Sequence, residues 1–188
     1  MRIRNCLLVV VLAAGLGACH GAGGGGPQMS RVTAWLTDAP GTDMIESAQV
    51  TISTVYLVGT DGTARDTLST NAGVFDLLDL QNGLKAFLGT ATIAAGDYEQ
   101  LRLVVTDATI TLKTGFTFSD GTATHDLKVP SGPQSGIKVN FGGPVHIAPP
   151  TTTLTIDFPI DENFVFTGGS SSPNGVLFKP TLHGTVTQ

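Results

Sequence analysis

Beyond residue 28 the chain alternates apolar and polar residues with a period of two, and no stretch keeps a convincing helical period. Leu101, Leu103 and Val105, for example, take alternate positions in one run. Alternation of this kind places the apolar side chains of a strand on one face. It predicts strands at residues 30–37, 49–58, 74–80, 98–106, 109–113, 115–118, 122–129, 136–141, 152–158, 163–166 and 176–186.

Short breaks rich in Gly, Asp and Asn separate these runs, at Asp61-Gly62, Asp120-Gly121 and Asn174-Gly175. Asp120-Gly121 is the strongest hairpin signal, because threonines and aromatic residues alternate around it. Pro180 lies inside the last run and indicates an edge strand or a bulge there.

One segment, residues 79–88, is the helix candidate, since Leu80, Leu84, Phe87 and Leu88 fall at helical spacing. The glycines at 83 and 89 would limit it to one or two turns. Many short strands with at most one short helix predict an all-β domain, and we expect a Greek-key β-sandwich of the immunoglobulin-like or transthyretin-like kind.

The segment Ile93–Tyr98 resembles the tyrosine corner of Greek-key sandwiches. In that arrangement a tyrosine entering a strand returns its hydroxyl group to the backbone of the preceding crossover. Gly96 would supply the tight corner. The alternative is a plain turn followed by a tyrosine at the edge of the core.

The N-terminal segment has the three parts of an export signal. Arg2 and Arg4 form the positive start, residues 6–16 form an apolar stretch, and small residues precede Cys19. The stretch Leu16-Gly17-Ala18-Cys19 resembles the lipobox of bacterial lipoproteins. The resemblance implies cleavage between Ala18 and Cys19 and lipidation of Cys19, and the alternative is an ordinary secretory signal with a chance cysteine after it. The predicted organisation is a signal peptide at 1–18, a glycine-rich tether at 19–28 and one domain at 29–188.

Composition after cleavage limits the partners. The 188-residue chain would keep its 15 acidic residues but lose Arg2 and Arg4 from its 10 basic ones, which gives a net charge near −7. That balance argues against nucleic acid as a partner. Cys6 leaves with the signal, so Cys19 is the remaining cysteine and no disulfide can form within the chain. The hydrophobic core must therefore stabilise the domain.

Five motifs in order resemble a bacterial lipoprotein family that is catalogued only as a domain of unknown function. The resemblance implies a β-rich exported domain and supplies no substrate, cofactor or catalytic residue. The motifs lie in Ser30–Pro40, Asp76–Gly83, Ala95–Val105, Leu127–Gly132 and Leu154–Phe158.

Candidate catalytic residues are sparse. Gly132-Pro133-Gln134-Ser135-Gly136 is one position away from the spacing of a hydrolase nucleophile elbow. His20, His125, His146 and His183 are scattered, with no pair at metal-ligand spacing. We therefore expect no enzymatic activity, and we keep as an alternative a hydrolase assembled from loop acids and a histidine.

Calcium is the metal that the acidic loops could bind, because Ca²⁺ prefers carboxylate and carbonyl oxygens. Asp38 and Asp43 share one loop, whereas Asp157, Asp161 and Glu162 crowd another. Neither loop has the spacing of an EF-hand. We favour the interpretation that these acids are turn-forming and solvated residues, so no cofactor is expected.

Aromatic residues are concentrated in the second half of the chain, and core packing explains them without a ligand. Trp35 or Tyr56 could instead stack on a sugar. We interpret the chain as a lipid-anchored lipoprotein of the bacterial envelope with a non-catalytic binding or structural domain, and the alternative is a surface adhesin or carbohydrate-binding module. The expected partners are the membrane, through Cys19, and an unidentified protein or carbohydrate. His20 in place of aspartate after Cys19 favours the outer membrane.

Overall fold

The computed structural model describes residues 26–38, 43–130, 135–169 and 172–188. Within them the all-β prediction is confirmed, while the signal segment, Cys19 and most of the tether lie outside the described residues. No helix in the described ranges is long and apolar enough to cross a membrane. The strands are β1 (Met29–Thr37), β2 (Ile45–Gly59), β3 (Arg65–Ser69), β4 (Gly73–Asp76), β5 (Ala86–Ala94), β6 (Gly96–Leu112), β7 (Thr124–Asp126), β8 (Ile137–Asn140), β9 (Val145–Ile147), β10 (Thr151–Asp157), β11 (Phe164–Gly168), β12 (Pro173–Phe178) and β13 (Leu182–Thr187).

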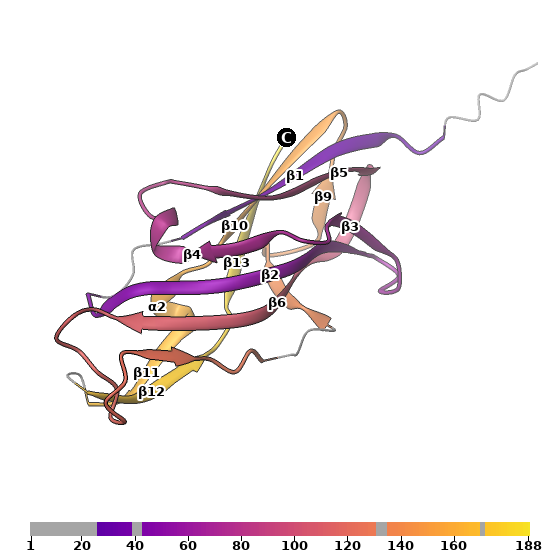
Figure 1. Ribbon diagram of the computed structural model, residues 1–188. Coiled ribbons are helices and arrows are strands. Elements are labelled where there is room, and N and C mark those ends of the chain that lie inside the picture. Colours follow the sequence, from indigo (N-terminus) through magenta and orange to yellow (C-terminus); the bar gives the residue numbers. More distant parts are fainter. Residues whose placement is uncertain (1–25, 39–42, 131–134, 170–171) are drawn as a thin grey trace, which may run out of the picture.

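One 11-stranded sheet forms the body of the domain, with the order β3-β2-β6-β8-β13-β10-β1-β5. β4 also pairs with β2, and β7 and β9 also pair with β6. The pairs β1–β10 and β8–β13 are parallel, while the other pairs are antiparallel. A separate hairpin of β11 and β12 lies at one end of the molecule (Figure 1).

The two ends of this strand order meet at Gly89 of β5. A Cβ atom built on Gly89 would lie 2.6 Å from the Leu68 carbonyl oxygen and 2.7 Å from the Ser69 Cβ, both in β3. The sheet therefore curls until its first and last strands touch, which makes it nearly closed and barrel-like. The Greek-key sandwich expected from the spacing of the strands is not confirmed.

β6 is the longest strand and links the halves of the sheet. It pairs with β2 along one edge, and along the other edge it pairs in turn with β9, β8 and β7. The segments 98–106 and 109–113, predicted as two strands, are thus parts of one strand, with an irregular register against β2 near Thr51 and Ile52.

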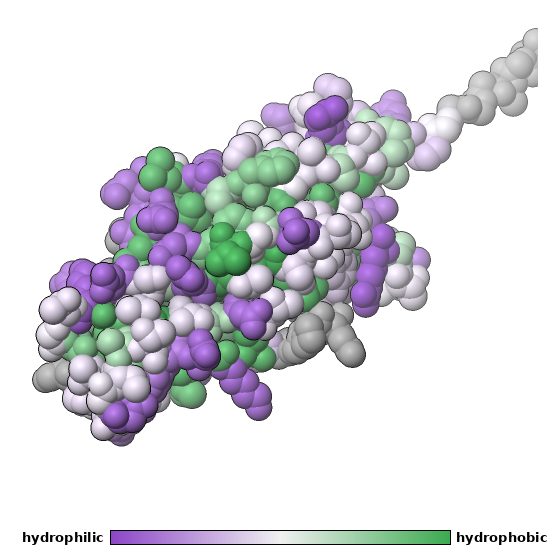
Figure 2. All heavy atoms as spheres, in the orientation of Figure 1, coloured by the Kyte–Doolittle hydropathy of each residue, from purple (hydrophilic) through white to green (hydrophobic). Residues whose placement is uncertain are grey.

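The core lies inside the curled sheet and is filled by alternate residues of its strands. The core extends to the β11–β12 hairpin, where Phe158, Phe164 and Phe178 are buried and stack with ring centroids 5.3–6.4 Å apart. Core packing therefore accounts for these aromatic residues, as predicted. On the face shown in Figure 2, apolar side chains form small groups among polar ones.

The predicted helix at 79–88 is wrong over most of its length. A single 3-10 turn, η1 (Leu77–Leu80), overlaps only its first two residues, and the Asp76 carboxylate caps this turn by accepting from the Leu78 amide at 3.1 Å. Phe87 and Leu88 belong to β5, where Phe87 is exposed and Leu88 is buried. A short helix that the sequence did not indicate, α2, spans Ile160–Asn163.

Several boundaries also differ. Residues 115–118 form no strand, and β3, β5 and β9 were not predicted. Asn174-Gly175 lies within β12 and does not break the run. The turn at Asp120-Gly121 is confirmed, because the Gly121 amide donates to the Phe118 carbonyl at 2.9 Å. Pro180 separates β12 from β13, so the last run is two strands.

The hydrogen bond predicted for the tyrosine corner is present. Tyr98 Oη donates to the Ala94 carbonyl at 3.0 Å, across the connection from β5 to β6. Gly96 in this connection has a φ of 147°, which favours glycine. Burial, and secondarily the Asp66 carboxylate, raise the pKa of Tyr98 to about 12. The phenol therefore stays a donor across the ordinary pH range.

We expect Gly89→Ala to destabilise the domain by roughly 1–3 kcal/mol, because the added methyl group would meet backbone that cannot move alone. Gly175→Ala is the matched control, since it also lies in a strand and its Cβ would come no closer than 3.9 Å to Thr167 Oγ1. Urea midpoints measure both. Equal midpoints for the two variants would contradict the contact between β3 and β5.

Candidate functional site

The outward side chains of β5, β1, β10 and β13 form a continuous face, which we call the outer threonine face. Trp35 of β1 lies opposite Phe87 of β5 and Thr155 of β10, and Thr155 lies opposite Thr185 of β13. Their neighbours along the strands are mostly buried, so this row points to solvent. One row across four strands thus combines two aromatic rings with two hydroxyl groups.

The next row consists of four threonines, Thr90, Thr33, Thr153 and Thr187, in the same strand order. The hydroxyls of Thr33 and Thr90 are 3.3 Å apart, and Thr90 Oγ1 donates to the Val32 carbonyl at 2.9 Å. Threonine suits exposed strands because its branched side chain packs well on a pleated surface. Four in a row also create a regular array of hydroxyl and methyl groups.

Charged side chains lie toward the ends of this face. Arg31 is at the tether end, opposite Thr151, and Asp157 is at the other end, opposite His183. Lys85 reaches the middle, where its Nζ lies 3.5 Å from Thr155 Oγ1. The two central rows are otherwise uncharged.

The aromatic part of the face is partly exposed. Trp35 and Phe87 meet edge to face, with centroids 5.4 Å apart and an interplanar angle of 70°. Phe87 is 49% exposed, and Leu84 beside it is 62% exposed. Thr37 Oγ1 donates to the Leu84 carbonyl, which holds this segment against β1. The face therefore offers an apolar centre bordered by hydroxyl groups.

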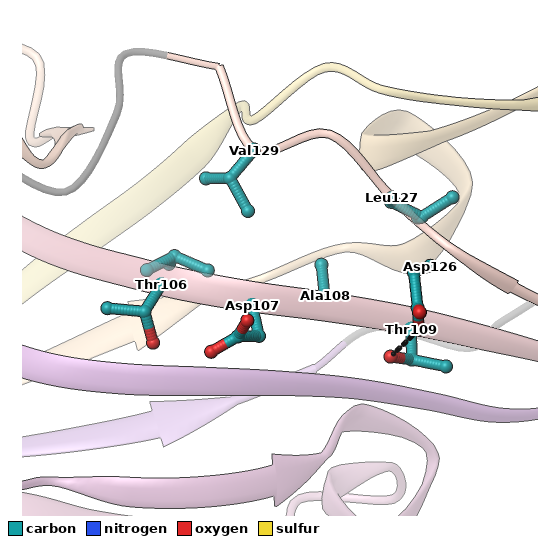
Figure 3. Close-up of a pocket in the computed structure, with 8 residues that line it drawn as sticks. Thr106, Asp107, Ala108, Thr109, Asp126, Leu127 and Val129 are labelled. Carbon is teal, nitrogen blue, oxygen red and sulfur yellow. Dashed lines mark hydrogen bonds between the residues drawn. The ribbon is translucent and has the colours of Figure 1, made fainter.

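A cavity of about 310 Å³ lies beside β6, under the segment that follows β7 (Figure 3). Asp126 accepts from Thr109 Oγ1 at 2.9 Å, and the Leu127 amide donates to the Ala108 carbonyl at 2.7 Å. Asp107 lies on the same stretch of β6. Of the described residues, those that line the cavity include no histidine, serine or cysteine. Its polar lining consists of the carboxylates of Asp107 and Asp126 and the hydroxyl groups of Thr106 and Thr109.

Of the histidines predicted as scattered, His20 lies outside the described residues, and His125, His146 and His183 each meet a different carboxylate. The distances are 2.9 Å for His125–Asp120, 2.7 Å for His146–Asp97 and 3.1 Å for His183–Glu162. In the described part of the chain none of these histidines has a serine or threonine hydroxyl as a partner. No Ser-His-acid triad is assembled among these residues.

Asp120 makes three hydrogen bonds to residues close to it in the chain. The Thr122 amide and hydroxyl, followed by His125, lower the pKa of Asp120 to about 2. Its His125 partner also stacks on Phe118, with ring centroids 3.8 Å apart. These contacts fix the turn between β6 and β7 and account for the geometry of both residues.

Ser135 was the serine of the possible nucleophile elbow. Residues 131–134 lie outside the described residues, and the Ser135 carbonyl accepts from Tyr56 Oη and Arg102 Nη1, each at 2.8 Å. Tyr56, which the sequence indicated as a possible sugar platform, is 4% exposed. Its ring therefore offers almost no surface to a sugar.

The calcium candidates are divided among different contacts. Asp38 is buried and accepts from the Ile160 amide at 3.1 Å, which links β1 to α2. Asp43 is exposed, and the residues between these two acids are outside the described part. Glu162 pairs with His183, and Asp161 accepts from the Glu162 amide. Among the described residues, no group of three His, Cys, Asp or Glu could hold a metal ion.

The sequence identified Trp35 but missed the threonines around it. The sequence pattern predicts a helix at Phe87 and indicates nothing more than strands for the other members of the two rows. The available signal was the Thr-x-Thr pattern, which recurs at 90–92, 153–155 and 185–187. These threonines can be recognised as one surface only when the register of the four strands is known.

Asp157→Asn should raise the denaturation midpoint at pH 7. Burial raises the pKa of Asp157, with the neighbouring His183 acting in the opposite direction and Glu162 adding to the rise. The folded state therefore binds the proton more tightly than the unfolded state, so stability is lost as pH rises through the folded pKa. Asparagine cannot ionise, and the difference should vanish near pH 3. Asp161→Asn is the exposed control, and a gain equal to that of Asp157→Asn would contradict this reading.

Comparison with known proteins places the domain in a family. No curated protein matches the chain. A similar solved structure is MbnP from Methylosinus trichosporium, with 13% identity, a TM-score of 0.37, and coverage of 79% of this chain and 83% of that one. The family model described as domain of unknown function (DUF4382) matches residues 29–180, in agreement with the resemblance seen in the motifs. The chain therefore belongs to the DUF4382 family.

Proposed function

We propose that this chain is a lipid-anchored protein of the bacterial cell envelope whose domain binds an uncharged glycan on the outer threonine face. The observation that carries the proposal is the row of Phe87, Trp35, Thr155 and Thr185, placed beside a row of four threonines. The domain acts by binding and not by catalysis.

The chemistry of a sugar fits this face. A pyranose ring has apolar C–H faces and a rim of hydroxyl groups. An indole such as Trp35 can stack on the C–H face while threonine hydroxyls exchange hydrogen bonds with the rim. Neighbouring strands are about 4.8 Å apart, so the hydroxyl groups repeat across the sheet at a short, regular distance. A polymer of repeated sugars can use several such rows at once.

The charge distribution favours an uncharged ligand. Arg31 and Asp157 lie at opposite ends of the face and have opposite signs. Lys85 is the cation whose nitrogen reaches the central rows. A strongly anionic polymer would meet the acidic chain as a whole, with its formal net charge of −5, without a matching basic surface on this face.

The anchor and the face are adjacent in the chain. Gln28, the last tether residue, accepts from the Ala95 amide at 2.7 Å, and β1 begins at Met29. Nine residues, 20–28, would separate the lipid on Cys19 from this strand, a root-mean-square reach of about 17 Å. The tether would therefore hold the domain close to the membrane, and His20 favours the outer one.

Cys19→Ser tests the anchor. The variant cannot form the thioether to diacylglycerol, so we expect it to leave the membrane fraction of a bacterial host or to accumulate uncleaved. Intact mass spectrometry of the parent chain should find acyl groups on Cys19. Recovery of the parent chain from the soluble fraction with an unmodified Cys19 would refute the anchoring proposal.

Trp35→Ala tests the binding face. Affinity electrophoresis through gels that contain an α-glucan, a β-glucan or a mannan should retard the parent chain in at least one gel, and we expect the variant to bind about tenfold more weakly. A Thr33→Val/Thr153→Val double variant removes two hydroxyl groups at nearly constant shape and should weaken binding as well.

Val74→Ala is the control, because Val74 is an apolar residue of β4 that is 63% exposed and lies outside this face. It should migrate like the parent. Unretarded migration of the parent in every gel, or equal retardation of the parent and the Trp35 variant, would overturn the glycan proposal.

A further inference from the structure

A second surface, on the outside of β3, β2 and β6, brings two arginines together. Tyr56 of β2 lies opposite Arg102 of β6, and Val58 of β2 lies opposite Arg65 of β3. These residues line a depression of about 180 Å³, which we call the two-arginine depression. Gly62, Gln100 and Ser135 complete its lining.

The floor of the depression is largely apolar. Tyr56, Val58 and Val104 are 4–6% exposed and form a small apolar cluster separate from the main core. Cζ of Arg65 lies 5.0 Å from the centroid of the Tyr56 ring. A guanidinium over an aromatic face is attracted to it without using its N–H donors. The contact with Tyr56 therefore leaves the N–H donors of Arg65 unused.

Arg102 is fixed by neutral acceptors. Its Nη1 donates to the Ser135 carbonyl at 2.8 Å and to the Gly136 carbonyl at 3.2 Å, and its Nε donates to Gln100 Oε1 at 3.1 Å. These bonds orient the guanidinium through neutral acceptors and place no carboxylate in direct contact with it. Tyr56 Oη donates to the same Ser135 carbonyl at 2.8 Å, so the loop and both side chains form one unit.

Neither arginine has a carboxylate partner in the described part of the chain, where every ion pair within 4.0 Å involves a histidine. The chain has 15 acidic residues and only 10 lysines and arginines, so carboxylates are not scarce. Two like charges at one depression repel each other unless an anion offsets them. A planar guanidinium offers paired N–H donors, and phosphate accepts such pairs well.

We propose that the two-arginine depression binds a phosphate monoester group. At neutral pH this group carries between one and two negative charges, which matches the two cations, and its three terminal oxygens can accept from both guanidinium groups. The site is independent of the outer threonine face, which lies on other strands. The phosphate can belong to a lipid headgroup or to a small soluble molecule, since both present the same atoms.

Glu99 provides a second test, because its charge should affect phosphate binding in the opposite direction to that of Arg65. Its carboxylate accepts from Gln100 Nε2 at 3.0 Å, beside the depression. A negative charge there opposes an incoming anion through space. Removing the charge should therefore strengthen phosphate binding, whereas removing the charge of Arg65 should weaken it.

The experiment is a calorimetric titration of the purified chain, held in a non-ionic detergent, with inorganic phosphate at constant ionic strength. We expect Arg65→Gln to weaken binding about tenfold or more and Glu99→Gln to tighten it severalfold. Affinity for the parent chain should rise between pH 5 and pH 7 as the phosphate loses its second proton. Arg31→Gln, on a different face, is the control for general charge and should bind like the parent.

Two further measurements identify the source of the phosphate group and separate phosphate binding from a purely structural role of the arginine. The first compares inorganic phosphate with short-chain phosphatidic acid and the matching phosphatidylcholine. Tighter binding of phosphatidic acid, with no binding of phosphatidylcholine, identifies a lipid headgroup. Equal affinities for phosphatidic acid and inorganic phosphate show that the phosphate group alone is recognised. Arg65→Lys keeps the positive charge but loses the paired N–H donors, so it should bind phosphate more weakly than the parent and more tightly than Arg65→Gln. No phosphate binding by the parent, or equal binding by the parent and Arg65→Gln, would overturn the site without bearing on the glycan proposal.

Discussion

The close approach of β5 to β3 at Gly89 is the constraint on which the rest of the domain depends. Because a methyl group at this position would meet the backbone of β3, only glycine lets the two end strands of the sheet come together. Once they meet, one set of side chains is enclosed and the alternate set faces solvent. Val32, Ala34 and Leu36 of β1 are enclosed, and Thr33 and Trp35 between them must point outward.

This division between enclosed and outward side chains explains why the candidate binding residues lie on the outer surface of the sheet. The interior is packed with aliphatic and aromatic side chains, and its few buried polar residues bridge elements, as Asn163 does when its side chain bonds Pro159 and Thr181. The functional candidates are therefore outward surfaces on different strands. The outer threonine face depends on the pairing of β5, β1, β10 and β13, and the two-arginine depression depends on the pairing of β3, β2 and β6. Each surface can be altered without touching the other.

Local signals in the sequence predicted local features well. The alternation of Leu101, Leu103 and Val105 identified a strand with one buried face, and the segment before Tyr98 indicated its hydrogen bond to the backbone. β5 was missed because its apolar and small residues do not alternate cleanly and a bulge shifts its register beside Trp35. The same irregularity let Leu84, Phe87 and Leu88 imitate a helix.

Features that join distant segments could not be predicted. The row through Trp35 requires residues near 87, 155 and 185 to come into register, one of these pairings being parallel. Asp38 reaches α2 across 122 residues, so its role in binding the Ile160 amide had no local sign. Asp97 and His146 meet across 49 residues in the same way. Such contacts are properties of the closed sheet, not of any one segment.

The most direct test of the central claim is to map the bound glycan by nuclear magnetic resonance. The purified chain would be titrated with the polysaccharide that retards it, while the backbone amide signals are followed. The account predicts that the shifts concentrate in β1, β5, β10 and β13, at Thr33, Trp35, Thr90 and Thr155, and that those of Tyr56 and Arg102 stay in place. Shifts centred on the cavity beside β6, at Asp107 and Asp126, with the outer threonine face unchanged, would contradict it.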